Sequence, residues 1–457
     1  MSKEAAGADK HTKMTTLPVE GLVCRMAVPT IVIMLVSAVY SVTDTYFVSQ
    51  ISTGATAGVG VSFPLMAFIQ ALGLFFGQGC GNYISRMLGA RDLGAVSRMT
   101  AAGFVSALLA GVLIMTAGLL DTQRLALILG STETILPYAS AYLRFILMGA
   151  PWMIGSILLN NILRFQGSPL YAMIGIVSGT VLNIGLTPLF IFVFDMGVAG
   201  AGASTMVSQA VSFVILLVGC RRGGAEIKLK NFTPCLSIYK EIAMSGLPSL
   251  CRQLLAGMSA VVLNRTAGAY GDEAIAALSI VSRMVMLIVF ITIGFAQGFQ
   301  PVAGFNYGAG RYDRVMRSFW FGVKVSTAFL AAMAAIAIIF APQIIALFLR
   351  DSQVIEIGAT TLRLMSMSFP LLGFIIMANV MLQTIGKAGR ASILASSRQG
   401  VFLIAYLLTL PRFFGLLGIQ LSVPFADVSA FILSVPITAS VLKEMKNAWE
   451  GAQKSSG

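Results

Sequence analysis

The chain carries little charge and a single histidine. Of its 457 residues, 11% are Asp, Glu, Lys or Arg, 57% are hydrophobic, and the mean hydropathy is +0.86. A soluble domain of this length needs more polar surface than this composition supplies, so we predict a chain embedded in a lipid bilayer. The histidine, His11, precedes the first apolar stretch, so no imidazole relays protons within the apolar stretches. Any proton transfer within the apolar stretches therefore depends on carboxylates.

The sequence also lacks the common signatures of enzymes and metal proteins. Its five cysteines are scattered and show no CxxC spacing, which predicts neither a metal site nor a disulfide. It has no Walker loop, no His-rich cluster and no nucleophile with a neighbouring base. The first 20 residues are polar and lack the apolar core of a secretory signal. We therefore expect no enzymatic activity and no cofactor.

Basic residues outnumber acidic ones by 31 to 18, for a net charge of +13. They gather in the short segments that follow even-numbered apolar stretches, for example Arg86, Arg91, Arg98, Arg311, Arg314 and Arg317. Basic loops stay in the cytoplasm, so this pattern places both termini inside and explains the charge without nucleic-acid binding. We expect a multi-pass protein of the plasma (inner) membrane.

Apolar stretches long enough to cross about 30 Å of hydrocarbon recur along the whole chain. They predict an all-α integral membrane protein with twelve transmembrane helices. The expected spans are 22–48, 57–83, 94–119, 137–163, 170–193, 196–219, 240–268, 274–303, 316–342, 355–384, 391–415 and 419–442.

Two copies of one pattern follow each other along the chain. Pro29 and Pro248 are 219 positions apart, and the same step relates many later pairs, among them Gln78 with Gln297 and Asn160 with Asn379. Six spans per copy start both copies on the same side of the membrane. Repeated bundles that face a central site are typical of secondary transporters. The expected parts are a polar cytoplasmic tail (1–20), a six-helix bundle (21–220), a cytoplasmic linker (221–239), a second six-helix bundle (240–445) and a cytoplasmic tail (446–457).

Two acids lie clearly inside apolar stretches, Asp44 and Asp427. An ionisable residue in a membrane span is costly and is often functional, because it pairs with or transfers a cation. Asp44, within VYSVTDTYFVSQ, is a candidate for a carboxylate that binds and releases a coupling ion. The alternative is an interfacial acid that reaches the outer headgroups. The change of Asp44 to Asn distinguishes the two.

Polar residues of the fifth and sixth spans belong to the same half as Asp44. Asn183, Thr187 and Thr205 carry oxygens that bind Na+ or hydrogen-bond a protonated carboxyl. The alternative role is hydrogen bonding between neighbouring helices, which is common for Asn and Thr in membranes.

Motifs along nearly the whole chain, residues 20 to 445, resemble the multidrug and toxic compound extrusion family, in the branch with DNA-damage-inducible and bacterial drug-efflux members. They include AVPTIVIMLVSAVYSVTDTYFVSQ, GQGCGNYISRMLGARD, LLNNILRFQGSP and VLNIGLTPLFIF in the first half, and YGDEAIAALSIVSRM and GFNYGAGRYDRV in the second. The resemblance implies a V-shaped fold of two six-helix bundles. It further implies export of substrates from a central cavity by an antiported cation, with Asp44 as the coupling acid and Asn183 and Thr205 as its polar neighbours.

The chain departs from the family pattern at one position of this set. Where members often have a second acid four residues after the Asn, this chain has Thr187. A hard cation prefers several charged oxygens, whereas a proton needs one carboxylate. We therefore favour H+ over Na+ as the coupling ion and leave open a Na+ site at Asp44, Asn183 and Thr205.

Substrate and gating residues are expected in both halves. A cavity that binds flat, hydrophobic, mainly cationic small molecules suits pliable Met and polar amide side chains, although such residues on membrane helices often face lipid or the core. The candidates are Met66, Gln70, Gln78, Asn160, Gln297 and Asn379. Asp427, Arg398 and Gln399 resemble family positions in the second bundle and are candidates for gating contacts.

Two other functions remain open from the sequence. A flippase for lipid-linked saccharides or other lipids of the same superfamily needs cationic residues facing its cavity, and Arg144 and Arg252 are examples of Arg in or near spans. An ion channel needs neither the duplication nor the coupling acid. We favour a multidrug antiporter that acts as a monomer.

Overall fold

The structure of the protein, a computed structural model, describes residues 11–224, 227–349 and 351–456. The expected tail at 1–20 and linker at 221–239 lie partly outside these residues. Every regular element in the described part of the chain is helical, which confirms the all-α prediction. Eleven of the described helices are long and apolar enough to cross a membrane, and a bent pair makes a twelfth if it is counted as one span.

The chain divides into two compact units. Unit 1 consists of Met1–Met14 and Val32–Leu250, and unit 2 of Thr15–Ile31 and Cys251–Gly457. The first helix of each repeat, α2 (Val19–Ser49) or α9 (Leu236–Ala267), is therefore divided between the units. The two division points, after Ile31 and after Leu250, are again 219 positions apart. The duplication seen in the sequence is thus repeated in how the chain packs.

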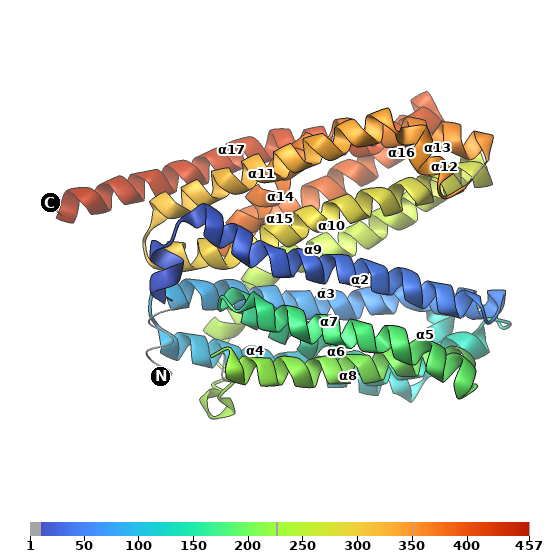
Figure 1. Cartoon of the computed structure of the whole chain (residues 1–457), viewed down its shortest axis with the longest axis horizontal. Coiled ribbons are helices and arrows are strands. Elements are labelled where there is room, and N and C mark those ends of the chain that lie inside the picture. The colour runs from blue at the N-terminus through green and yellow to red at the C-terminus, as the bar shows by residue number, and fades with distance from the viewer. Residues whose placement is uncertain (1–10, 225–226, 350, 457) are drawn as a thin grey trace. The chain divides into compact units, whose positions relative to one another are not determined.

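Unit 1 also contains six α-helices of the first repeat and one π-helical segment (Figure 1). Their bounds are α3 (Thr53–Gly89), α4 (Leu93–Leu120), α5 (Thr122–Ile128), α6 (Leu136–Phe165), α7 (Pro169–Pro188), η1 (Leu189–Val193) and α8 (Gly197–Arg222). A 3-10 turn, η2 (Leu229–Asn231), precedes α9.

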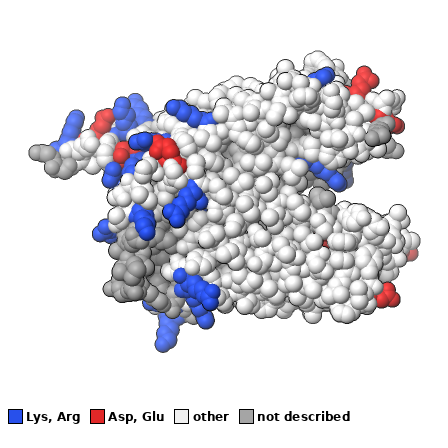
Figure 2. Space-filling view, in the orientation of Figure 1, with Lys and Arg blue, Asp and Glu red and all other residues white. Residues whose placement is uncertain are grey.

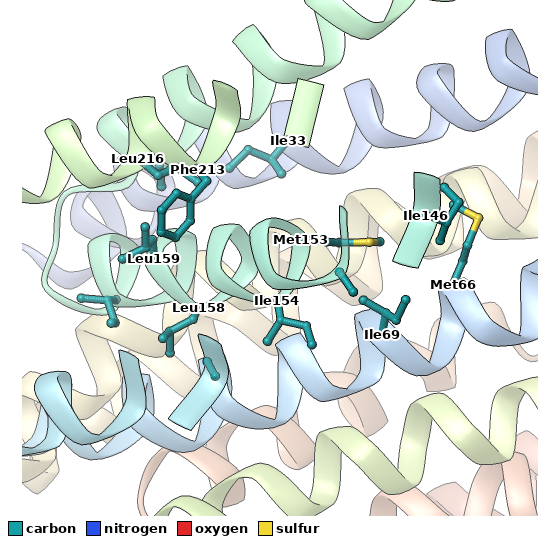
Figure 3. Packing of buried hydrophobic residues seen from close by; sticks show 14 of the residues in the cluster. Ile33, Met66, Ile69, Ile146, Met153, Ile154, Leu158, Leu159, Phe213 and Leu216 are labelled. Carbon is teal, nitrogen blue, oxygen red and sulfur yellow. The ribbon is translucent and has the colours of Figure 1, made fainter. Parts of the chain in front are cut away.

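Helix α6 is the centre of unit 1. It packs against α3, α4 and α8, and 78% of its most apolar stretch is buried. A helix that is apolar around most of its surface is typical of the interior of a bundle, and α6 has this character. Figure 3 shows Met153, Ile154 and Leu158 of α6 among Ile69 of α3 and Phe213 of α8. This core joins α3, α4 and α8 to α6 and includes Ile33 and Val48 of α2.

Unit 2 contains the corresponding helices of the second repeat, with more interruptions. Their bounds are η3 (Gly268–Tyr270), α10 (Asp272–Gly308), α11 (Tyr312–Ile339), α12 (Ala341–Ala346), α13 (Ser352–Met367), α14 (Phe369–Thr384), α15 (Ala388–Ser396), η4 (Ser397–Phe402), α16 (Leu403–Phe414) and α17 (Leu416–Ser456). The tenth expected span, 355–384, is the bent pair α13 and α14, with an angle of 52° at Ser368. Pro370 lies two residues after the bend, where proline lacks the N–H donor and crowds the preceding turn. Its counterpart Pro151 lies inside the continuous helix α6.

Glycines at equivalent positions of the two repeats let the divided helices α9 and α2 pack closely. In unit 1, a Cβ on Gly79 of α3 would lie 2.5 Å from the carbonyl oxygen of Ile242 in α9. In unit 2, a Cβ on Gly298 of α10 would lie 2.4 Å from the Cα of Ala27 in α2. Small residues allow such backbone contact between membrane helices.

In each unit an ion pair involves a residue near the start of a repeat's first helix. Arg86 of α3 pairs with Glu241 of α9 in unit 1, and Arg317 of α11 pairs with Glu20 of α2 in unit 2, with 2.6 Å between Arg317 Nε and Glu20 Oε1. Figure 2 shows Lys and Arg gathered mainly at one end of each unit, the end that holds the α3–α4 turn in unit 1 and the α10–α11 turn in unit 2. The basic residues expected to share one membrane face therefore lie at one end within each unit.

Candidate functional site

Asp44 lies on the part of α2 that belongs to unit 1. Its side chain is buried, with 8% of the residue exposed, and its Oδ1 has no hydrogen-bond partner among the described residues. A buried carboxylate oxygen without a donor is costly while it is charged. The cost falls when a proton or a metal cation occupies that oxygen.

A buried network of hydroxyl and amide groups joins α7 to α8. Asn183 Nδ2 donates to Ser204 Oγ and Thr205 Oγ1, both at 3.4 Å. Thr187 Oγ1 lies 3.3 Å from Asn183 Oδ1 and 2.8 Å from Ser204 Oγ. All four residues are at most 4% exposed. These groups largely satisfy one another.

A tyrosine, Tyr40, connects this network to the helix of Asp44. Tyr40, one helical turn before Asp44, places its hydroxyl 3.3 Å from Thr205 Oγ1. Tyr142 of α6 is fully buried, and its hydroxyl donates to Met66 Sδ at 3.6 Å. Hydrogen bonds through Tyr40 and Thr205 therefore link the helix of Asp44 to the network between α7 and α8.

The sequence prediction for this cluster named Asp44, Asn183, Thr187 and Thr205. The structure joins the last three by hydrogen bonds and places Asp44 beside Tyr40 on α2, without a direct bond to them. Tyr40 and Ser204 were not predicted. The spacing of four residues between Tyr40 and Asp44, which puts both on one helix face, was the signal available for Tyr40.

The predicted substrate residues are distributed over four helices. Met66 and Gln70 lie one turn apart on α3, and Gln78, further along α3, accepts a hydrogen bond from Asn82 at 3.4 Å. Gln297 is half-buried on α10. A cavity of about 310 Å³ in unit 1 is lined by other residues, among them Tyr83, Arg98 and Cys235.

The other two predicted substrate residues, Asn160 of α6 and Asn379 of α14, bind main-chain carbonyls within their own units. Asn379 Oδ1 also accepts a hydrogen bond from Arg252 Nη1 at 3.2 Å. Both asparagines therefore contribute to helix packing.

Unit 2 holds a second buried acid, and this one is paired. Asp427 of α17, 1% exposed, accepts from Arg398 Nε at 2.6 Å through Oδ1 and from Ser368 Oγ at 2.6 Å through Oδ2. Gln399 follows Arg398 in η4, and its Oε1 is buried without a partner among the described residues. Two of the three predicted second-bundle residues, Arg398 and Asp427, thus form one ion pair. Within the described residues, no group of three or more His, Cys, Asp or Glu could hold a metal ion.

The family model described as MatE matches this chain twice, at residues 29–189 and 248–407. The two matches begin at Pro29 and Pro248, the prolines that first indicated the duplication. The chain belongs to the MATE family. It is therefore a membrane transporter with an internal repeat, and not an enzyme.

Curated relatives of this MATE protein are similar over most of their length. The multidrug export protein MepA of Staphylococcus saprophyticus is 29% identical over 406 residues, which cover 88% of this chain and 89% of the relative. MepA of Staphylococcus aureus strain MRSA252 is 28% identical over 415 residues, which cover 90% and 91%.

Solved transporter structures match the fold. One, described as MATE in complex with MaL6, has a TM-score of 0.90 at 26% identity and covers 95% of this chain and 99% of its own. Another, a multidrug resistance MATE family transporter in an outward-facing conformation, also has a TM-score of 0.90 at 26% identity, with 95% and 98% covered. A transporter from Pyrococcus furiosus, described as having a binding pocket of reverse polarity, has a TM-score of 0.88 at 27% identity, with 95% and 98% covered.

Proposed function

We propose that this protein is a multidrug exporter that moves hydrophobic, mainly cationic small molecules out of the cell in exchange for H+, through alternating access. The observation that carries the proposal is the buried Oδ1 of Asp44, which has no partner among the described residues and lies on the same helix face as Tyr40. Relatives named as multidrug export proteins support the substrate class.

An unpaired buried carboxyl suits antiport because its charge must be neutralised before it is stable in the membrane. A proton taken up on the outside neutralises it, and loss of that proton on the inside restores a negative group that attracts a cationic substrate. The two cations then compete for one group, and this competition couples their opposite movements.

The hydrogen bonds around Asp44 support H+ over Na+. Na+ requires several oxygen ligands that are free to converge on it. Here the Thr187 and Ser204 hydroxyls and the Asn183 amide bind one another. Thr187 also offers no charge where many family members have an acid. One protonated carboxyl beside Tyr40 requires none of these groups to move.

Placement in the cell follows from the charges at one end of each unit. Lys and Arg near span ends remain on the cytoplasmic side, so we place the α3–α4 and α10–α11 turns in the cytoplasm. We therefore propose that both termini are cytoplasmic, and we further propose that the protein acts as a monomer in the plasma membrane.

The test is transport of a fluorescent cation by proteoliposomes under separate pH and Na+ gradients. We expect export driven by the pH gradient and lost in Asp44→Asn, with no loss in Glu356→Gln, which changes an exposed carboxyl. Export driven by the Na+ gradient alone would contradict H+ coupling, and unchanged pH-driven export in Asp44→Asn would contradict the role of Asp44. Movement of a labelled lipid-linked saccharide, with no export of any cation, would support the flippase instead.

A further inference from the structure

Unit 2 contains polar groups that the coupling scheme does not use, at the junction of η4, α17 and the α13–α14 bend. We infer that Arg398 and Gln399 form a ligand subsite that binds a carboxylate, or a similarly strong acceptor group, on the transported molecule. This inference rests on the proposed function, because it concerns which substrates the exporter accepts.

Arg398 has N–H donors that form no hydrogen bond within the described residues. A guanidinium carries five N–H donors. Among the described residues, the only hydrogen-bond partner of the Arg398 side chain is Asp427, which takes Nε. The pair is not the two-pronged form typical of Arg and carboxylate, because Ser368 occupies Asp427 Oδ2. Nη1 and Nη2 therefore remain available for a planar acceptor.

Arg398, which has the unused N–H donors, is also the more exposed member of the ion pair. The side chain of Arg398 is 21% exposed, whereas that of Asp427 is 2% exposed. Asp427 is thus enclosed and limits the rotation of the guanidinium, while part of the Arg398 side chain is accessible. A fixed guanidinium loses less conformational entropy when it binds a carboxylate than a freely rotating one does.

Gln399 supplies a complementary group next to Arg398. Its Oε1 is buried and has no donor among the described residues, a state that costs free energy until a donor arrives. Ser259 of α9 donates to the main-chain oxygen of Gln399 and holds this residue in place. Both residues lie in the π-helical segment η4, and π-helical turns occur frequently at functional sites. A ligand that carries an acceptor beside an N–H satisfies both side chains.

The first repeat has no room for an equivalent group. The position 219 residues before Arg398 is Gly179 of α7, where a Cβ would lie 2.7 Å from the Ser212 Cβ and 3.1 Å from the Ser208 carbonyl oxygen. The helices touch there, so a long side chain is excluded in unit 1. The arginine is therefore specific to unit 2 and is not an element of the shared repeat.

The charge of the subsite predicts which molecules bind to it more tightly. Asp427 offsets the positive charge of Arg398, so a simple anion gains little from long-range attraction. A carboxylate on a molecule that is otherwise cationic gains directional hydrogen bonds from Nη1 and Nη2. Arg398 therefore raises the affinity for zwitterions relative to simple cations.

The experiment compares two dyes that differ in one group: rhodamine B, which has a free carboxylate, and its ethyl ester, which has none. Their binding to the purified full chain in nanodiscs is measured by fluorescence without any ion gradient. In the double variant Arg398→Gln, Asp427→Asn, which removes both charges together, we expect rhodamine B to bind about tenfold more weakly and the ester to bind within about twofold of wild type. Neither dye carries an N–H donor for Gln399 Oε1, so Gln399→Leu should change the binding of both dyes by less than about twofold.

Arg398→Lys provides the comparison if the double variant fails to fold. It keeps the charge opposite Asp427 but loses the planar fork, so it should weaken rhodamine B selectively. Equal weakening of both dyes in folded variants indicates a purely structural ion pair and overturns the subsite, as does unchanged binding of rhodamine B. Failure of the wild-type protein to export the ester under a pH gradient contradicts the proposed function instead, since the binding measurement involves no gradient.

Discussion

Asn160 and Asn379 make the same hydrogen bond in the two repeats. Asn160 Nδ2 donates to the carbonyl oxygen of Ala172 at 3.3 Å, and Asn379 Nδ2 donates to that of Ala391 at 2.8 Å. Both the donors and the acceptors are separated by 219 positions. Each bond fixes the fourth helix of its repeat to the fifth, so the duplication is preserved in side-chain contacts as well as in sequence.

The two asparagines should differ in their contribution to stability. Asn160→Ala removes one neutral hydrogen bond and should cost about 1 kcal/mol, whereas Asn379→Ala also removes the bond from the charged Arg252 and should cost about 2 to 3 kcal/mol. Thermal unfolding in detergent measures the order of the two midpoints. Thr116→Ala, at an exposed hydroxyl, is the control. Equal losses from both asparagine variants would show that the Arg252 contact adds no stability.

A second acid at position 187 should change the ion preference. Thr187 touches both Asn183 and Ser204, so Thr187→Asp adds a charged oxygen to the network near Asp44. Two carboxylates and several neutral oxygens suit Na+. We expect export by this variant to be stimulated by a Na+ gradient, measured with the pH gradient collapsed. Thr187→Asn, similar in size and uncharged, should show no such stimulation, and a Na+ response in both variants would exclude the added charge as its cause.

Close helix packing predicts opposite effects for two glycines of α9. A Cβ on Gly246 would lie 2.3 Å from the carbonyl oxygen of Phe75, whereas a Cβ on Gly257 meets nothing within 4 Å. Gly246→Ala should therefore destabilise the protein by about 1 to 3 kcal/mol through overpacking. Gly257→Ala should stabilise it by up to about 1 kcal/mol, because Ala is the better helix former. Thermal midpoints that fall by the same amount in both variants would contradict the packing argument.

The thiol of Cys235 should react at lower pH than an ordinary cysteine. Cys235 is exposed, and its pKa is lowered chiefly by hydrogen bonding to Ser237, whose Oγ lies 3.1 Å from the Cys235 Sγ. A lowered pKa keeps the reactive thiolate present at a pH where a free cysteine is protonated. The rate of iodoacetamide labelling should therefore reach half of its maximum at a lower pH. The measurement uses a variant in which the other four cysteines are replaced by alanine.

Removal of the Ser237 hydroxyl supplies the matched control for this thiol. In Ser237→Ala, the midpoint of the labelling profile should move up towards the ordinary thiol value. A midpoint that stays in place would show that Ser237 does not stabilise the thiolate.

Much of the fold was predictable from local pattern. The spans expected at 57–83 and 94–119 correspond to α3 and α4, since hydropathy and helix length depend on neighbouring residues only. The bend at Ser368 was not predicted. Pro151 and Pro370 are matched in sequence, yet α6 continues through the first and the second lies two residues after a bend. Whether a proline bends a helix depends on the helices packed around it.

For the candidate site, residue type alone identified Asp44, because an acid within an apolar stretch stands out in any reading of the chain. The link from Tyr40 to Thr205, the pairing of Arg398 with Asp427 and the unpaired Oε1 of Gln399 became visible only in the folded chain. These contacts join residues 165 and 29 positions apart in the first two cases. Periodicity and composition describe one helix at a time, whereas a hydrogen bond between helices depends on how each helix is rotated and set against its neighbours.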